Sequence, residues 1–178
     1  SRILDVGCEN GELLKFLDKG KTIDGRGLEI SQKNVNICVK HGLSVGQGDA
    51  DKDLISYSSK SFDFVILSQT LQATHSPEKV LSQLVRISKY AIVSFPNFGS
   101  WLVRLKLLIN GIMPQSKSLP HTWYTTPNIH LCTIKDFKKL CEKNSIKIEK
   151  SFYLNKYGKQ INNPIGKIFN NFFHYFFF

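Results

Sequence analysis

The sequence has little of what would hold a chain in a membrane or cross-link a small secreted domain. Its 178 residues contain no apolar run of eighteen residues, so we expect neither a membrane-spanning helix nor a signal peptide. The four cysteines form no CxxC pair, and no second pair of ligand types completes a metal site. We therefore expect reduced, packed thiols, no bound metal, and a reducing, cytoplasmic location.

Acidic residues are scarce in the second part of the chain. Residues 1–100 hold 12 basic and 11 acidic side chains, a net charge of +1, whereas residues 101–178 hold 12 basic and 3 acidic ones, a net charge of +9. Such an excess is typical of a basic face for an acidic partner, nucleic acid or membrane surface, or of a solvated surface. Because only 4 of the 24 basic residues are arginine, and no aromatic-interleaved binding motif occurs, we favour the solvated surface.

The most informative stretch is at the start of the chain. Residues 2–6 predict a buried strand, residues 7–11 a glycine-containing turn, and an amphipathic helix begins near residue 10. A second predicted strand, near residues 23–30, contains Glu29 at its end. Units of this kind hold a nucleoside in α/β proteins, since the acid accepts hydrogen bonds from ribose hydroxyls.

The turn also indicates which ligand it accepts. A dinucleotide fingerprint that begins at Gly7 requires glycine at positions 9 and 12, and both positions are glutamate. A carboxylate is unfavourable where a pyrophosphate should lie, because such a turn and the following helix N-terminus attract anions. We therefore expect no binding of NAD or NADP, and a ligand that is cationic and lacks phosphate.

Strands and helices alternate along the chain. The predicted strands cover residues 2–6, 23–30, 43–47, 61–67, 90–95 and 146–154. Predicted helices begin after Ser31, Ser76, Ser100 and Thr133, each of which is a residue type that caps helices. The aromatic tail, residues 165–178, favours a last strand over a helix on a membrane surface. Five strands that alternate with helices indicate a mostly parallel sheet with right-handed crossovers.

Several segments resemble a known family. The motif Asp5-x-Gly7-x-Glu9-x-Gly11 resembles the first motif of class I S-adenosylmethionine-dependent methyltransferases, which usually runs acid-x-Gly-x-Gly-x-Gly. Longer segments resemble one family within that class, the MetW proteins of methionine biosynthesis, and they are residues 66–74, 91–99 and 123–137. The resemblance covers roughly residues 2–155, and it departs from the family pattern at Glu9, where glycine is usual.

The resemblance implies a fold. It is a doubly wound, Rossmann-like α/β fold with a mostly parallel sheet of seven strands in the order 3-2-1-4-5-7-6, the last strand being antiparallel. We expect a single domain over residues 1–178, with a nucleoside-binding half at 1–95 and an acceptor or partner half at 96–178. Family members normally have a helix before the first strand, and we expect that the present sequence lacks it.

The resemblance also implies a binding site for S-adenosylmethionine at the carboxyl ends of the strands. The residues that match the family's cofactor site are Asp5, Gly7, Gly11, Glu29, Asp49 and Ser68. The two glycines would give backbone room for the methionine part of the ligand. Glu29 would hold the ribose, Asp49 would receive the adenine amino group, and Ser68 would line the floor.

Two observations weigh against the assignment of these residues to a cofactor site. A Cβ and a carboxylate at Glu9 would crowd the methionine part of the ligand, so retention of the cofactor is a question for the structure. Taken singly, Glu29 is equally explained as a solvated strand end, and Asp49 as a turn residue.

Methyl transfer requires alignment of an in-line nucleophile and, in some enzymes, a base. The candidates for the acceptor side are Gln69, His121, Trp123, Tyr124 and His130. A single loop histidine more often makes a structural hydrogen bond, so these are candidates and no catalytic residue is assigned. No G-x-S-x-G nucleophile elbow occurs.

Two functions therefore remain. The first is a methyltransferase that uses S-adenosylmethionine. The second, implied by the resemblance to the MetW family, is a non-catalytic subunit that activates a homoserine O-acyltransferase. The fold supports both, because function depends on the site and not on the fold.

Overall fold

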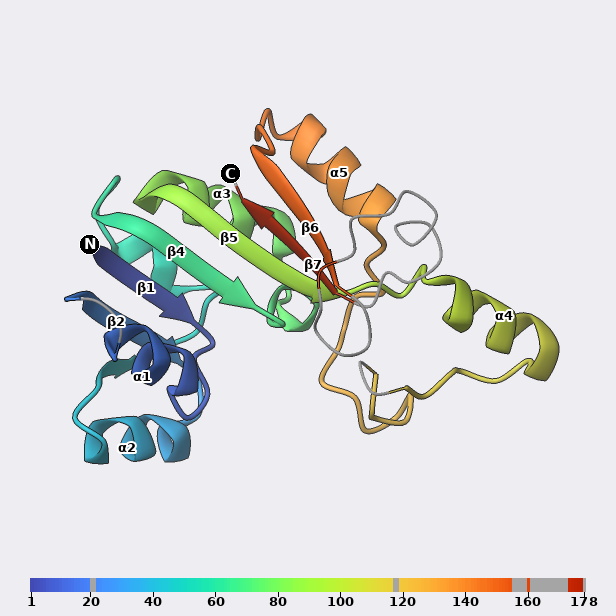
Figure 1. Ribbon diagram of the computed structural model, residues 1–178, viewed down its shortest axis with the longest axis horizontal. Coiled ribbons are helices and arrows are strands. Elements are labelled where there is room, and N and C mark those ends of the chain that lie inside the picture. Colours follow the sequence, from blue (N-terminus) through green and yellow to red (C-terminus); the bar gives the residue numbers. More distant parts are fainter. Residues whose placement is uncertain (20–21, 117–118, 155–159, 161–172, 178) are drawn as a thin grey trace.

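The computed structural model describes residues 1–19, 22–116, 119–154, 160 and 173–177. The strands are β1 (Arg2–Val6), β2 (Asp24–Glu29), β3 (Ser44–Gln47), β4 (Phe62–Ser68), β5 (Ser88–Pro96), β6 (Lys150–Leu154) and β7 (Phe173–Phe177). The helices are α1 (Glu12–Asp18), α2 (Gln32–Lys40), α3 (Pro77–Ile87), α4 (Trp101–Asn110) and α5 (Ile134–Lys143), with 3-10 turns η1 (Asp53–Ser56) and η2 (Leu71–Ala73). Figure 1 shows their arrangement.

The strands form one twisted sheet in the order β3-β2-β1-β4-β5-β7-β6. Strands β1 to β5 are parallel to one another, and β7 runs antiparallel to both β5 and β6. The predicted α/β class and strand order are confirmed. In the central strand β4, Val65 and Leu67 are fully buried on one face, and Phe62 is buried on the other, as expected for a strand covered on both faces.

The main core lies between the sheet and helices α3 and α5. Side chains of α3 and α5 join the same buried cluster as those of β1, β4 and β5. Within it the rings of Phe95 and Phe137 lie 4.8 Å apart between centroids, which joins α5 to β5. A smaller cluster of Cys8, Leu14 and Cys38 packs α1 and α2 near β1.

Two of the four predicted helix caps accept a side-chain hydrogen bond. The Ser31 hydroxyl accepts a hydrogen bond from the Asn34 amide at 3.4 Å, and Thr133 accepts one from the Asp136 amide at 3.2 Å. Ser76 and Ser100 occupy the N-cap positions of α3 and α4 as predicted, but their side chains accept no capping hydrogen bond. Before α3 the acceptor is instead a distant carboxylate.

That carboxylate belongs to Asp51, in the loop after β3. Its two oxygens accept the amides of His75 and Ser76 at 2.8 and 2.7 Å. These partners are 24 and 25 residues from Asp51 along the chain, so a local capping rule does not find them. The interaction ties the loop after β3 to the start of α3.

The carboxyl-terminal strands differ in extent from the prediction. Strand β6 begins at Lys150 and not at residue 146, because the chain is still completing the end of α5: the Ile146 amide donates to the Cys141 carbonyl at 2.8 Å. The predicted tail strand is present at Phe173–Phe177, and the rest of residues 165–178 lies outside the described residues.

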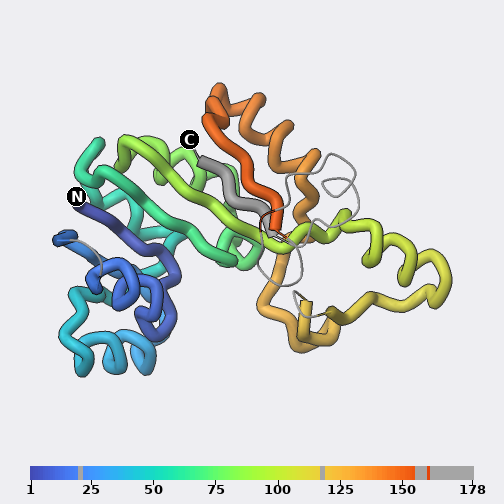
Figure 2. The backbone as a smooth tube through the Cα atoms, in the orientation of Figure 1, coloured from blue at the N-terminus to red at the C-terminus, as the bar shows by residue number. Residues whose placement is uncertain are grey.

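Helix α4 and the segment after it extend away from the end of β5 (Figure 2). Helix α4 ends at Gly111, which adopts the left-handed conformation (φ 64°) and donates its amide to the Leu107 carbonyl. No helix among the residues described above is both long and apolar enough to cross a bilayer.

Candidate functional site

The strand register brings the predicted site residues to one edge of the sheet. Val6 of β1 pairs with Leu28 of β2 on one side and with Leu67 of β4 on the other. The residues that follow these three in the chain are Gly7, Glu29 and Ser68, so they lie at the same carboxyl edge of the sheet. Asp49 follows close by, because the Gly48 amide donates to the Glu29 carbonyl at 3.0 Å. We call this edge the rim.

The turn after β1 uses its glycines for close packing within the chain. Gly7 has φ 72°, and a Cβ there would lie 2.5 Å from the Thr70 hydroxyl oxygen. Gly11 has φ 77°, and a Cβ there would overlap the Leu43 side chain. Both positions combine a left-handed backbone with close approach of a neighbour, so the fold itself requires glycine at each.

Glu9 lies between these glycines and is also left-handed, with φ 48°. A side chain costs free energy in this conformation, which explains why the related motif usually has glycine at this position. The Glu9 side chain is exposed, and its backbone amide donates to Glu29 Oε2 at 2.9 Å. The residue that departs from the motif is thus held by its backbone, with its carboxylate in solvent.

Glu29 is the organising side chain of the rim. It is buried, so it is not a solvated strand end. Its Oε2 accepts the Glu9 amide and its Oε1 accepts the Ser31 amide, each at 2.9 Å. The carboxylate thereby joins the turn after β1 to the start of α2. Each oxygen retains a second lone pair for a further donor.

Asp5 lies in β1, where it pairs with Gly27 of β2, and it is buried. Burial, the Glu29 carboxylate and the Glu9 carboxylate raise the pKa of Asp5 from its ordinary value of 3.8 to about 7. Asp5 is therefore partly protonated at neutral pH. A positive charge placed at this rim would favour its ionised form, whereas a phosphate would be repelled.

Asp49 and Ser68 are engaged with their own surroundings. The Asp49 carboxylate accepts the Asp51 amide at 2.9 Å and pairs with the Lys52 ammonium at 3.2 Å, which is the behaviour of a turn residue. The Ser68 hydroxyl lies 3.2 Å from the Ser94 hydroxyl of β5. These contacts fix both residues at the edge of the sheet, and each stays partly accessible.

The acceptor-side candidates do not form one group. Gln69 lies at the rim, where its amide nitrogens contact the Ser94 hydroxyl at 3.2 Å. His121, Trp123 and Tyr124 are exposed on the segment after α4, where the two aromatic rings meet edge to face at 5.5 Å. The backbone of this segment lies away from the carboxyl ends of β1 and β2 (Figure 2).

Gln72 is a residue that the sequence did not single out. It is 4% exposed, and its backbone carbonyl accepts the amides of Ile129 and His130 at 2.9 and 3.0 Å. Its side chain donates to the Gln69 carbonyl at 2.6 Å. Gln72 therefore connects His130 to the rim residue Gln69. Its only sequence signal was its place inside the segment 66–74.

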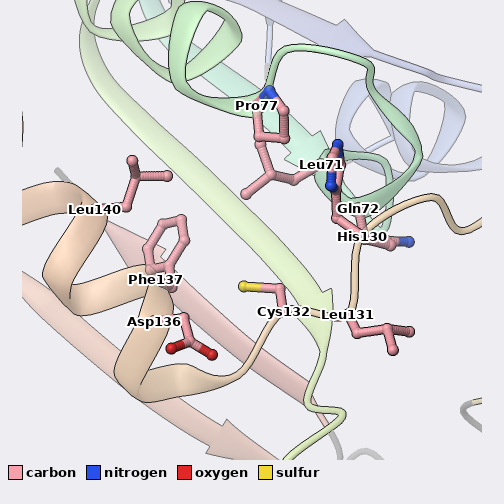
Figure 3. A pocket seen from close by; sticks show the side chains of 9 residues that line it. All are labelled: Leu71, Gln72, Pro77, His130, Leu131, Cys132, Asp136, Phe137 and Leu140. Carbon is pink, nitrogen blue, oxygen red and sulfur yellow. The ribbon is translucent and has the colours of Figure 1, made fainter.

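A cavity of about 270 Å³ lies beside this connection. Figure 3 shows the nine side chains that line it, from η2, α3, α5 and the segment before α5. Its lining is mainly apolar, with Leu71, Phe137 and Leu140 converging on it. Cys132 also borders it, and burial raises the pKa of the Cys132 thiol to about 12, so the thiol is protonated and a poor nucleophile at neutral pH.

Comparison with known proteins identifies the family. The family model described as "Methionine biosynthesis protein MetW" matches residues 1–176. The chain belongs to the MetW family. It is thus a protein of methionine biosynthesis with the fold of class I methyltransferases, and the resemblance seen in the sequence is confirmed.

A curated relative extends this result. The bifunctional methionine biosynthesis protein MetXA/MetW of Rhodopirellula baltica is 30% identical in an alignment of 162 residues that covers 86% of this chain and 26% of that protein. The chain therefore spans about a quarter of the length of this curated relative.

Solved structures share the fold of this MetW chain at low identity. A SAM-dependent methyltransferase from Archaeoglobus fulgidus has a TM-score of 0.68 and 18% identity, covering 99% of this chain and 84% of that chain. A putative methyltransferase in complex with the Haloferax volcanii Trm112 methyltransferase activator has a TM-score of 0.71 and 15% identity, covering 99% of this chain and 80% of that chain. At these identities the similarity shows the fold alone.

Proposed function

We propose that the chain binds S-adenosylmethionine at the rim and acts as an activating subunit of a homoserine O-acyltransferase. In this proposal residues 1–95 bind the nucleoside and residues 96–178 contact the partner. The observation that carries the ligand assignment is the buried negative charge at the rim. Burial and the carboxylates of Glu29 and Glu9 raise the pKa of Asp5 to about 7. A bound positive charge would offset this repulsion between carboxylates, so a cationic ligand is favoured.

The residues at the rim fit S-adenosylmethionine. Its positively charged sulfonium and ammonium groups would lie near the carboxyl groups of Asp5 and Glu9. The molecule carries no phosphate that these groups would repel. Glu29 would accept a ribose hydroxyl through a lone pair that the turn amides leave free, and Asp49 lies where it could receive the adenine amino group. The bound molecule would supply a methyl group to an acceptor if one is present.

The activating role is supported by two observations. The acceptor-side candidates are divided between the rim and the exposed segment after α4, so they do not form a constellation for aligning a nucleophile. The relative from Rhodopirellula baltica carries MetXA and MetW in one protein, and MetX is a homoserine O-acetyltransferase. Fusion in one chain supports physical association of the two activities.

Methyl transfer is the second candidate. It is favoured by Gln69, which lies at the rim, and by His130, which Gln72 holds close to it. A reducing cytoplasm suits either role, because the four cysteines of the chain are free.

An acyltransferase assay separates the two candidates. The rate of the homoserine O-acyltransferase from the same organism is measured with and without saturating chain, and with and without S-adenosylmethionine. A rate increase that needs the chain but consumes no S-adenosylmethionine supports the activating subunit. An unchanged rate, together with formation of S-adenosylhomocysteine in the presence of cell metabolites, would leave methyl transfer ahead.

A further inference from the structure

Helix α4 exposes an apolar face. Its side chains Leu108 and Ile109 are 82% and 70% exposed, Leu105 and Leu107 are also exposed, and so is Ile112 just after the helix. Within the helix only Val103 is buried. A helix this apolar normally packs its stripe against a core, yet α4 projects from the body of the protein (Figure 1). Contiguous exposed apolar surface of this kind marks an interaction site.

The surface continues into a groove on the segment that follows. Ile112 and Met113 lead from the helix into a hollow of about 310 Å³. Phe98, Leu119, Trp123, Ile129 and Leu131 are among the residues that line it. Trp123 is 75% exposed at this hollow. Exposed large aromatic side chains beside a pocket are typical anchors of protein interfaces. We call helix α4 and this groove the α4 surface.

The charge of the α4 surface has one sign. The sequence contains no acidic residue between Glu78 and Asp136, a stretch that includes the whole surface. Helix α4 itself carries Arg104 and Lys106. A complementary partner therefore presents apolar side chains at the centre of its contact and acidic side chains at the edge.

We propose that the α4 surface is where the homoserine O-acyltransferase docks, through an apolar face bordered by acidic residues. This inference rests on the proposed function, which supplies the partner, and adds the surface. Two further observations favour a protein over a bilayer. Helix α4 is only ten residues long with two basic side chains, whereas attraction to anionic lipid relies on larger basic clusters. In the relative, MetXA and MetW share one chain, which supports a protein as the occupant of this surface.

The test uses substitutions on the full chain with matched controls. Leu108→Asp and Ile109→Asp place a charge at the centre of the α4 surface. Ile55→Asp is the control, because Ile55 is 72% exposed on η1, away from this surface. We expect each α4 substitution to raise the Kd for the acyltransferase at least about tenfold and the control to leave it unchanged. Circular dichroism and thermal unfolding verify that each variant folds.

A charge substitution provides a second readout. Arg104→Glu reverses a charge at the edge of the surface. We expect it to slow association and to weaken the dependence of the association rate on salt, with a smaller effect on dissociation. Lys40→Glu, at the end of α2, is the control and should leave the rate unchanged.

The outcomes separate this inference from the proposed function. If wild type binds the acyltransferase and both α4 variants retain its affinity, the docking surface is wrong while the activating role stands. If wild type does not bind, both fail. If the variants lose only co-sedimentation with phosphatidylglycerol–phosphatidylethanolamine vesicles, the surface contacts a bilayer. If the α4 variants differ from wild type only in that sedimentation velocity no longer detects a dimer, the α4 surface binds a second copy of this chain. Either of these last results overturns the inference.

Discussion

The rim and the α4 surface are opposites in burial and in charge. At the rim, Asp5 and Glu29 are buried and the Glu29 oxygens bind backbone amides. On the α4 surface, Leu108 and Ile109 are exposed and the only charges are positive. The comparison teaches that polar groups here are enclosed where a small ligand would bind. Apolar groups are exposed where a large partner would bind. Each prediction below alters one side of this contrast, from the largest expected effect to the smallest.

Removing the organising carboxylate should have the largest effect. Glu29→Ala leaves the amides of Glu9 and Ser31 without their acceptor, so we expect the free energy of unfolding to fall by about 3–4 kcal/mol. Urea unfolding measures this loss. Glu12→Ala is the control, because its exposed ion pair with Lys15 contributes less than about 0.5 kcal/mol. Equal losses in the two variants would show that Glu29 does not organise the rim.

The pH dependence of stability tests the buried negative charge. The pKa of Asp5 rises from 3.8 to about 7 on folding, so its stabilising contribution is full below pH 4 and is lost as pH rises through 7. We expect Asp5→Asn to be more stable than wild type at pH 8 by about 2–3 kcal/mol, and to lack this decline.

The control for this titration is Asp18→Asn, on the exposed side of α1. It should keep the decline in unfolding free energy between pH 4 and pH 7. A wild-type free energy of unfolding that does not fall relative to that of Asp5→Asn over this interval would contradict a raised Asp5 pKa.

A pair of glycines separates backbone conformation from close packing. Gly7 and Gly42 have φ of 72° and 76°, but only Gly7 has a neighbour, Thr70, within contact distance of a Cβ. We expect Gly42→Ala to lower the free energy of unfolding by about 1 kcal/mol and Gly7→Ala by about 2 kcal/mol or more. Thermal or urea unfolding measures both. Similar losses would mean that Thr70 moves aside without cost.

The smallest effect is expected at Glu9. Glu9→Gly relieves a left-handed side chain and should raise the free energy of unfolding by about 1 kcal/mol. Because the Glu9 side chain is exposed, the affinity for S-adenosylmethionine should change by less than about tenfold. Ser145→Gly is a matched control, since Ser145 has φ 54° at the end of α5, far from the rim. A larger gain in affinity at Glu9 would identify this side chain as an obstacle to the ligand.

The sequence predicted the parts of this protein that depend on local pattern. Strand β4 reads as an apolar run, and parallel strands place Gly7, Glu29 and Ser68 at one edge by register. What it could not predict depends on contacts between distant residues. Glu29 meets the Glu9 amide 20 residues away, and Asp51 meets Ser76 25 residues away. No periodicity in the sequence encodes such pairs.

The exposure of helix α4 is a second feature that the sequence pattern does not predict. Its composition is that of a buried helix, with five leucine and isoleucine residues among Trp101–Asn110, and burial is the ordinary expectation. Exposure of Leu108 and Ile109 follows from where the chain leaves β5, which pattern alone does not specify. The same residue types therefore serve packing in α3 and surface exposure in α4.

Calorimetry on the full chain tests the central claim most directly. S-adenosylmethionine, S-adenosylhomocysteine and NAD are titrated into wild type and Glu29→Ala at pH 8. We predict saturable binding of the two adenosyl ligands by wild type, loss of about 1.5–3 kcal/mol of binding free energy in Glu29→Ala, and no heat of binding with NAD. Absence of binding of both adenosyl ligands at millimolar concentration, or saturable binding of NAD, would contradict the account.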